Sequence, residues 1–419
     1  MIAEEKNQRL MDRVEDIEKF KDDAGKMFQA VRTAISMKDK KELLIDTGRG
    51  VTTDEGRQVH LITEFFQDYF TSEKAEEAGI NITPEPMNKP FTSEEILKAI
   101  SKLKNNKSPG IDKLNGELLK YGPDSVAEII AELLNTAAET GNHPLEINTG
   151  ILTPLQKPGK ARGPCSNLRP IILLSILRKI LAITLMDRVA DRILQHVPHS
   201  QSAYQKDRST TEQIFAFKIL AEKAITSEDY HANILLMDMS KAFDTVDRKT
   251  LLEDLKRIVN PDELHMIKIL LDEVKLAVRV GKTTGELFQT NVGVPQGDCL
   301  SPILFILYLA KAPEFEPAMQ DHLYTKPSHM GEKTPSEVLE HNYGISKEEI
   351  YRRQKESLTI PAQYADDCGS ITISKYPEVM EYQKQMMPGM LAKRNLSCNE
   401  TKTEEYSVCR KGDTGYKKM

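Results

Sequence analysis

The segment ANILLMDMSKAFDTVD, residues 232–247, decides the fold. Its apolar run ILLM predicts a buried strand that leaves the core at Asp238. Further along the chain, QYADDCGSITIS, residues 363–374, places Asp366 and Asp367 between two strand-like stretches. This pattern predicts a tight hairpin with both carboxylates at its tip. If the two segments share a sheet, the carboxylate at the end of one strand lies beside the pair at the hairpin.

Carboxylates gathered at strand ends indicate metal chemistry. Adjacent carboxylates raise each other's pKa unless a cation neutralises them, so a divalent ion would explain Asp366 and Asp367. An aspartate pair at a turn also has a local explanation, because the Asp side chain bonds the backbone there. The strand-end Asp238 shifts the balance toward metal binding. Two ions about 4 Å apart, held by carboxylates and completed by phosphates, form the two-metal site of polymerases and nucleases.

Two further stretches carry candidate contacts to a substrate. Phe243 lies where the chain turns from strand into helix, and it is either a core aromatic or a ring that excludes a 2′-hydroxyl from a nucleotide sugar. In GVPQGDCLSP, residues 293–302, Gly297 allows another surface to approach closely. A Gly-Pro turn before a helix explains the glycines and prolines of this loop but gives Gln296 no role.

Basic residues supply a third group of candidates. The stretch ILTPLQKPGKARGPCSNLRPIILL, residues 151–174, predicts a hairpin with a basic tip, and the proline after Arg169 favours an extended backbone there. Lys157 and Arg169 are either solvated or paired with a triphosphate, Arg by bidentate bonds and Lys as a point charge. Lys402 in NETKTEEY is equally open, since a lysine beside a departing pyrophosphate acts as a general acid.

The remainder of the chain predicts mostly helices. We expect helices joined by polar loops over residues 1–90, a capping box at Thr92 ahead of another helix, and a long helix from Ile171 to about His196. Strands are predicted at residues 232–238, 275–293 and 362–374. The polar stretch at about 313–359 has few apolar residues and predicts a long surface insertion.

Composition limits the class of protein. The 419 residues are 39% hydrophobic and 29% charged, and no apolar run reaches the length of a bilayer span, so we expect no membrane association. The N-terminus has no secretory pattern, and the five cysteines are scattered without a CxxC pair, which predicts the reducing cytoplasm or nucleus. The net charge of −6 argues against a nucleic-acid partner, although residues 101–220 carry 16 basic against 11 acidic residues.

Taken in order, several motifs resemble those of one enzyme family. LMDMSKAFDTVD, GVPQGDCLSPILF, QYADD and NETKTEEY resemble the palm motifs of reverse transcriptases, and KLKNNKSPGIDKLNGELL and SNLRPIILLSILRKI resemble their finger segments. The set is most similar to the polymerases of non-LTR, LINE-like retrotransposons and covers about residues 91–406. The resemblance implies an α+β right-hand polymerase whose antiparallel palm sheet is backed by helices.

The resemblance also implies roles for individual residues. Asp238, Asp366 and Asp367 match the catalytic aspartates, which bind two Mg²⁺ ions (Mn²⁺ is an alternative), and the backbone carbonyl of Met239 matches a further ligand. The remaining matches are Phe243 at the steric gate, Gln296 and Gly297 in the loop that contacts nucleotide and template, Lys157 and Arg169 on the triphosphate, and Lys402 as the late palm lysine. Asp244 and Asp247 look structural.

From the resemblance we expect a helical N-terminal extension (1–90), fingers with the start of the palm (91–231) and a palm (232–419) that contains the insertion, with no endonuclease and no thumb. The expected function is an RNA-directed DNA polymerase core that adds deoxynucleotides to a primer 3′-hydroxyl. Its expected partners are an RNA template, a DNA or RNA primer and deoxynucleoside triphosphates. One rival is a truncated, weakly active or inactive remnant that binds RNA. Another is a different two-metal palm enzyme, such as a nucleotide cyclase or an RNA-dependent RNA polymerase.

Overall fold

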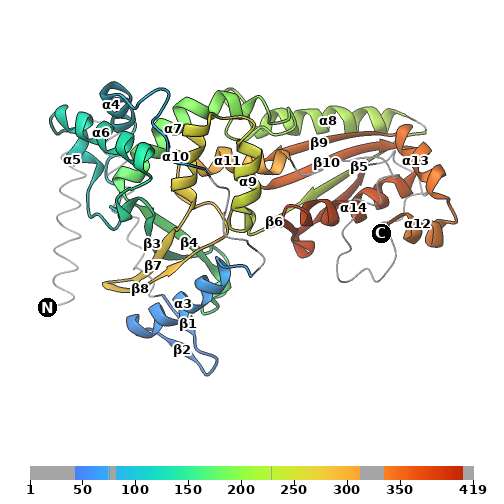
Figure 1. The fold of residues 1–419 in the computed structure, drawn as a ribbon. Coiled ribbons are helices and arrows are strands. Elements are labelled where there is room, and N and C mark those ends of the chain that lie inside the picture. Colours follow the sequence, from blue (N-terminus) through green and yellow to red (C-terminus); the bar gives the residue numbers. More distant parts are fainter. Residues whose placement is uncertain (1–42, 74, 76–81, 228, 312–334, 409–419) are drawn as a thin grey trace, which may run out of the picture.

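The computed structural model describes residues 43–73, 75, 82–227, 229–311 and 335–408. Within these ranges the chain is a mixed α+β protein with two four-stranded sheets and two short two-stranded ones. Helices cover the sheets and fill the space between them (Figure 1). The α+β class and the antiparallel sheet expected from the sequence are both confirmed. None of the described helices is long and apolar enough to cross a bilayer.

The first large sheet, called the β5 sheet, contains the strands with the candidate aspartates. Its order is β12 (Glu404–Val408), β5 (His231–Met237), β10 (Asp367–Ser374) and β9 (Leu358–Tyr364). All neighbours in it are antiparallel. Figure 1 shows helices α8 (Thr210–Thr226) and α14 (Pro377–Ala392) on opposite sides of this sheet. Ile371, with no exposed surface, belongs to the small core beneath α8.

The second large sheet, called the β3 sheet, combines distant parts of the sequence. Its order is β4 (Leu168–Leu174), β3 (Thr149–Gln156), β7 (Lys275–Val280) and β8 (Thr283–Gln289). The β3–β4 pair is the expected hairpin, and β3 pairs with β7 in parallel. Helix α3 (Glu55–Tyr69) packs on β7 and β8, and the lack of a side chain at Gly285 lets Val59 approach β8 closely. The β3 sheet therefore contains residues from both sides of position 231, where the fingers were expected to end and the palm to begin.

The main core lies between the two sheets and is made largely of helices. They are α4 (Ser93–Ser101), α5 (Gly116–Lys120), α6 (Ser125–Thr140), α7 (Ile176–Leu194), α9 (Arg248–Leu255), α10 (Pro261–Leu271) and α11 (Ser301–Ala310). Helix α11 is buried on nearly every face, as its continuous apolar run requires. The capping box of Thr92 and Glu95 is present, and Gly141 ends α6 with φ of 73°. Both sequence signals are thus confirmed.

Two sequence expectations about helices were wrong. The N-terminal region is not purely helical, because β1 (Ile45–Asp46) and β2 (Val51–Thr52) form a hairpin; residues 1–42 lie outside the described part. The helix expected from Ile171 begins at Ile176 instead. The apolar run before it pairs with β3, and the Ser175 side chain caps the helix by accepting a hydrogen bond from the Arg178 amide at 3.2 Å.

The surface insertion expected at 313–359 was also wrong in its second half. Residues 312–334 lie outside the described part, but α12 (Pro335–Tyr343) and α13 (Lys347–Lys355) are regular helices that pack on each other and on α14. Ile350 of α13 is fully buried in the main core. Strand β9 then begins at Leu358, inside the range expected to be loop.

Candidate active site

The hairpin between β9 and β10 carries the aspartate pair. Tyr364 faces Asp367 across the two strands, so Ala365 and Asp366 form a two-residue turn, with Ala365 at φ of 57°. Buried Gln201 braces this turn from outside the hairpin. Its Oε1 accepts a hydrogen bond from the Ala365 amide at 2.9 Å, and its Nε2 donates to the Ala365 carbonyl at 3.2 Å. One side chain therefore binds both backbone polar groups of Ala365 and holds the turn that carries the carboxylates.

The third aspartate joins the pair through the sheet register. Met237 of β5 faces Cys368 of β10, so Asp238 emerges one residue later, across from Asp367. The pKa of Asp366 is raised, chiefly by burial and then by the negative charges of Asp367 and Asp238. The expected convergence of the three carboxylates at one end of the β5 sheet is confirmed.

A lysine from the end of the described chain completes this group. Strand β11 (Ser397–Cys398) pairs with β6 (Met239–Ser240) directly after Asp238, which leaves the backbone of Met239 beside that carboxylate. The chain then turns so that Lys402 Nζ donates to Asp238 Oδ2 at 2.6 Å. The Asn399 amide binds the Asp238 carbonyl at 2.7 Å and holds the turn in place. The Lys402 side chain therefore neutralises part of the charge of the cluster.

These carboxylates fit a divalent ion whose coordination a substrate completes. In the described part of the chain, no three acidic, imidazole or thiolate groups converge on one point as a complete metal site. Mg²⁺ does not require one, because it is commonly held by one or two carboxylates together with substrate phosphates and water. Asp238 and Asp366 lie close enough to interact electrostatically, and the partly exposed Lys402 balances part of their charge. Hard oxygen ligands with excess negative charge suit such an ion.

Two basic residues of the β3–β4 hairpin approach the lysine that pairs with Asp238. Arg169 is exposed on β4 opposite Leu155, and Lys157 follows β3, where its Nζ donates to the Ser166 carbonyl at 2.8 Å. The pKa of Lys157 is lowered by partial burial and then by the positive charges of Arg169 and Lys402. Three cations from separate segments thus lie close together, which no local sequence pattern predicts.

The loop from residue 290 to residue 300, between β8 and α11, is called the glycine loop. It packs between the two sheets. Gly293 has φ of 81°, and a side chain at this position would meet the Asp244 backbone at 2.7 Å. Gly297 has φ of 124°, and a side chain there would meet the Ile172 carbonyl oxygen at 2.8 Å. The close approach expected at Gly297 is therefore to strand β4, and it ties the loop to the β3 sheet.

Two buried arginines hold the ends of this loop, and sequence reasoning missed both. Arg248 donates to the carbonyls of Thr290, Val292 and Gly293 at 2.8–3.0 Å. Arg178 pairs with Asp298 at 2.9 Å and is also bonded to backbone carbonyls of two other segments. Their positions in helices α9 and α7 gave no signal, because exposed and buried arginines look alike in a sequence.

Phe243 and Gln296 both contact the protein interior. Phe243 is half-buried and stacks on Phe305 with ring centroids 4.3 Å apart, so part of its ring belongs to the core. The Gln296 side chain binds buried Asp244, which sequence reasoning regarded as merely structural. Asp247, regarded in the same way, caps α9 by accepting from the Thr250 amide at 2.7 Å.

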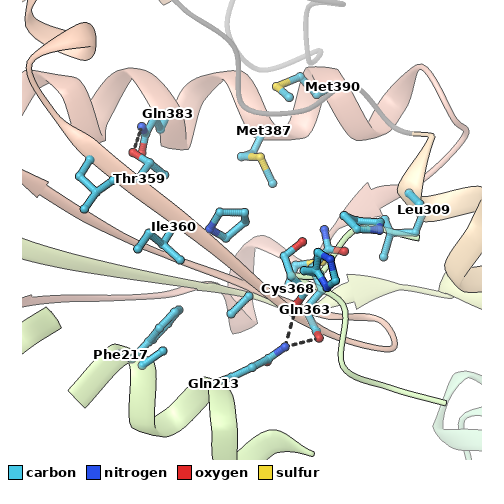
Figure 2. Close-up of a pocket in the computed structure, with 18 of the residues that line it drawn as sticks. Gln213, Phe217, Leu309, Thr359, Ile360, Gln363, Cys368, Gln383, Met387 and Met390 are labelled. Carbon is cyan, nitrogen blue, oxygen red and sulfur yellow. Dashed lines mark hydrogen bonds between the residues drawn. The ribbon is translucent and has the colours of Figure 1, made fainter. Parts of the chain in front are cut away.

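A pocket of about 910 Å³ lies behind the β9–β10 hairpin and is separate from the carboxylates. Figure 2 shows it between α8 and α14, with Phe217, Met387 and Met390 among its apolar walls. Gln213 and Gln383, two of its polar side chains, are hydrogen-bonded within the protein; for example, Gln213 Nε2 donates to the Gln363 carbonyl at 2.6 Å. None of the three aspartates lines it.

Comparison with known proteins places the chain in a family. Two curated relatives are an RNA-directed DNA polymerase from the mobile element jockey of Drosophila funebris, 28% identical over 54% of this chain, and a probable RNA-directed DNA polymerase from transposon BS of Drosophila melanogaster, 30% identical over 61%. The chain spans 25% and 29% of their respective lengths. Among solved structures, apo telomerase from Candida tropicalis, truncated from its C-terminal domain, aligns with 64% of this chain and 52% of its own at 13% identity and a TM-score of 0.40.

The family model described as reverse transcriptase (RNA-dependent DNA polymerase) matches residues 155–413, more than half of the chain. The matched range contains the three aspartates, the glycine loop and the cations Lys157, Arg169 and Lys402. The relatives named above come from mobile elements, as the sequence motifs implied. The chain belongs to the reverse transcriptase family.

Proposed function

We propose that this chain catalyses RNA-directed DNA synthesis, adding deoxynucleotides to a primer 3′-hydroxyl on an RNA template. The observation that carries the proposal is the convergence of Asp238, Asp366 and Asp367 at one sheet end, where Lys402 pairs with Asp238 and Lys157 lies near both Lys402 and Arg169. Carboxylates that hold divalent ions and cations that hold a triphosphate are the two halves of a phosphoryl-transfer site. The proposed partners are the template, a DNA or RNA primer and deoxynucleoside triphosphates, in the reducing cytoplasm or nucleus.

Reverse transcriptases are generally dependent on a divalent metal. We propose two Mg²⁺ ions, or Mn²⁺, held by Asp238 and Asp366 with Asp367 and the Met239 carbonyl beside them. Such ions lower the pKa of the attacking hydroxyl and stabilise the leaving pyrophosphate. In the same proposal the β5 sheet belongs to the palm and the β3–β4 hairpin to the fingers.

The remaining roles fall to side chains of this chain. Arg169 and Lys157 bind the triphosphate, which orients its reactive phosphorus for in-line attack. Phe243 borders the sugar with the part of its ring that the core does not cover, and Gln296 with Gly297 forms the wall beside the nucleotide. If a bound ion replaced its contact with Asp238, the Lys402 ammonium would be free to protonate the pyrophosphate.

The test is primer extension on poly(rA)/oligo(dT) with dTTP and Mg²⁺, comparing the parent protein with Asp366→Asn. We expect incorporation to fall by roughly a hundredfold to a thousandfold, because the variant keeps the shape of the side chain but loses the charge. The matched control is Asp229→Asn, which breaks an exposed ion pair with Lys375 and should leave the rate unchanged. Both variants should unfold at the parent temperature. Full activity in Asp366→Asn would overturn the mechanism.

A further inference from the structure

Helix α3 brings a tyrosine to the candidate nucleotide site from outside the matched range 155–413. The hydroxyl of Tyr69 donates to Asp244 Oδ2 at 2.9 Å. Asp244 is only 3% exposed, and Lys241 Nζ lies 3.7 Å from the centre of the Tyr69 ring. Burial and the neighbouring carboxylate raise the pKa of Tyr69, so the phenol stays a donor at neutral pH. A helix that covers the β3 sheet thus ends in a charged contact beside the glycine loop.

The other partner of Asp244 is Gln296. Its Nε2 donates to the two carboxylate oxygens at 3.0 and 3.1 Å. Because an ionised carboxylate only accepts hydrogen bonds, the amide of Gln296 must present its NH₂ group to Asp244. The carbonyl oxygen Oε1 is then directed away from Asp244, and within the described part of the chain it has no hydrogen-bond donor. One acceptor of fixed direction is left for a substrate.

Hydrogen bonds also attach the C-terminal end of α3 to the loop that carries Gln296. The Ser72 amide donates to Asn291 Oδ1 and Asn291 Nδ2 donates to the Ser72 carbonyl, each at 2.9 Å. The Asn291 amide also binds the Phe70 carbonyl at 3.2 Å. Asn291 lies only five residues before Gln296 in the same loop. Tyr69 and Gln296 are therefore fixed to each other both through Asp244 and through the backbone.

We propose that Tyr69 is a positioning residue for the nucleotide: through Asp244 it sets the direction of the Gln296 amide, so that Oε1 accepts a hydrogen bond from the incoming deoxynucleotide. This inference rests on the proposed function and deepens it, since it adds a residue from the N-terminal helix to the nucleotide site. Tyr69 acts through Asp244 and Gln296 and does not itself touch the reacting atoms.

The orientation of the Gln296 amide should depend on pH, because it depends on whether Asp244 is ionised. Burial raises the pKa of Asp244 to about 6, while hydrogen bonds from Tyr69 and Gln296 and the charges of Lys241 and Lys157 act to lower it. Below that pH the carboxyl is protonated and can donate a hydrogen bond, so the Gln296 amide is free to turn over. Removing the Tyr69 hydroxyl takes away one lowering influence and moves protonation of Asp244 to higher pH.

The experiment compares Tyr69→Phe with the parent protein in primer extension between about pH 5.5 and 8.5. We expect the KM for dTTP to rise about fivefold at pH 7 with a smaller change in kcat, and to approach the parent value at the alkaline end. The matched control is Tyr308→Phe, which removes a buried hydroxyl that donates to the Arg394 carbonyl at 2.6 Å. It should lower the unfolding temperature without moving the pH profile of KM.

A second measurement does not depend on catalysis. In protein labelled with ¹⁵N-glutamine, the side-chain signal of Gln296, identified by its loss in Gln296→Glu, should shift with a midpoint near pH 6 and at higher pH in Tyr69→Phe. A parent protein that adds no nucleotide would overturn the proposed function while this titration still decides the role of Tyr69. Equal midpoints in the two proteins, or a KM profile of Tyr69→Phe that matches Tyr308→Phe, would overturn the positioning role.

Discussion

The contact between Lys402 and Asp238 sets a lysine and a metal ion in competition for one carboxylate. The pair is 2.6 Å long, with the two side chains 53% and 28% exposed. Exposed ion pairs are worth about 0.2–1 kcal/mol, so the lysine can weaken metal binding only modestly. We expect Lys402→Met to lower the Mg²⁺ concentration for half-maximal primer extension by about two- to fivefold. The maximal rate should fall, because the proposed proton donor is lost.

The nearby ion pair of Lys384 with Glu405 provides the control. It is 2.9 Å long and similarly exposed, and it joins α14 to β12 of the same sheet. Neither of its residues is paired with any of the three aspartates. Lys384→Met should leave both the Mg²⁺ requirement and the maximal rate at the parent values. A higher Mg²⁺ requirement in Lys402→Met would show instead that the lysine supports metal binding.

Single residues differ in how far the sequence can predict them. The positions of Asp238, Asp366 and Asp367 follow from strand-end and turn patterns that a few neighbouring residues define. The role of Asp244 does not, since its partners Tyr69 and Gln296 lie 175 and 52 residues away. Burial by distant segments turned an ordinary aspartate into a shared acceptor, and no local pattern encodes that.

The glycine loop depends on a buried arginine in helix α9. Burial lowers the pKa of Arg248 to about 10, so the side chain remains charged at neutral pH. Its removal in Arg248→Met would leave three loop carbonyls without their donor, at about 1–3 kcal/mol for each unsatisfied group. We expect the free energy of unfolding in urea to fall by about 3–5 kcal/mol. Nucleotide addition by the remaining folded protein should also decrease.

Two variants separate the shape of Arg248 from its charge. Arg248→Lys keeps the charge but cannot reach three carbonyls in different directions, so it should recover only part of the stability. Arg257→Met, at an exposed position just beyond the end of α9, should change the free energy of unfolding by no more than about 0.5 kcal/mol. Full stability in Arg248→Lys would mean that charge alone matters.

Element boundaries show why patterns of apolar residues are incomplete. The run from Ile171 to Leu185 is apolar enough for either a strand or a helix, and periodicity cannot separate the two. Pairing with β3 makes its first four residues strand, and the Ser175 cap starts α7. Likewise, α12 and α13 have few apolar residues, and Ile350 alone of α13 is buried. Such helices are stabilised by the elements around them.

At the scale of the molecule, the described residues form three hydrophobic clusters around the two large sheets. The sequence predicted β5 and β10, the two central strands of the β5 sheet, because they carry strong patterns, but it predicted neither β12 nor the pairing of β3 with β7 across more than a hundred residues. The candidate site lies where the sheets meet. The Ile172 amide donates to the Gln296 carbonyl at 3.3 Å, and Tyr69 reaches Asp244 from the side of the β3 sheet.

Because separate clusters stabilise the two sheets, each sheet should be weakened by substitutions in its own cluster. Phe66 of α3 is 1% exposed in the cluster under the β3 sheet, and Ile371 is fully buried in the cluster under the β5 sheet. Phe66→Ala should cost about 3–5 kcal/mol and Ile371→Ala about 2–5 kcal/mol. In amide hydrogen exchange, Phe66→Ala should speed exchange in β3, β4 and β7 while β5 and β10 stay protected, and Ile371→Ala should do the reverse. Equal acceleration of both sheets in each variant would show that the molecule opens as a single cooperative unit, in which case the main core and the contacts of Gln296 and Asp244 join the sheets more strongly than their separate clusters suggest.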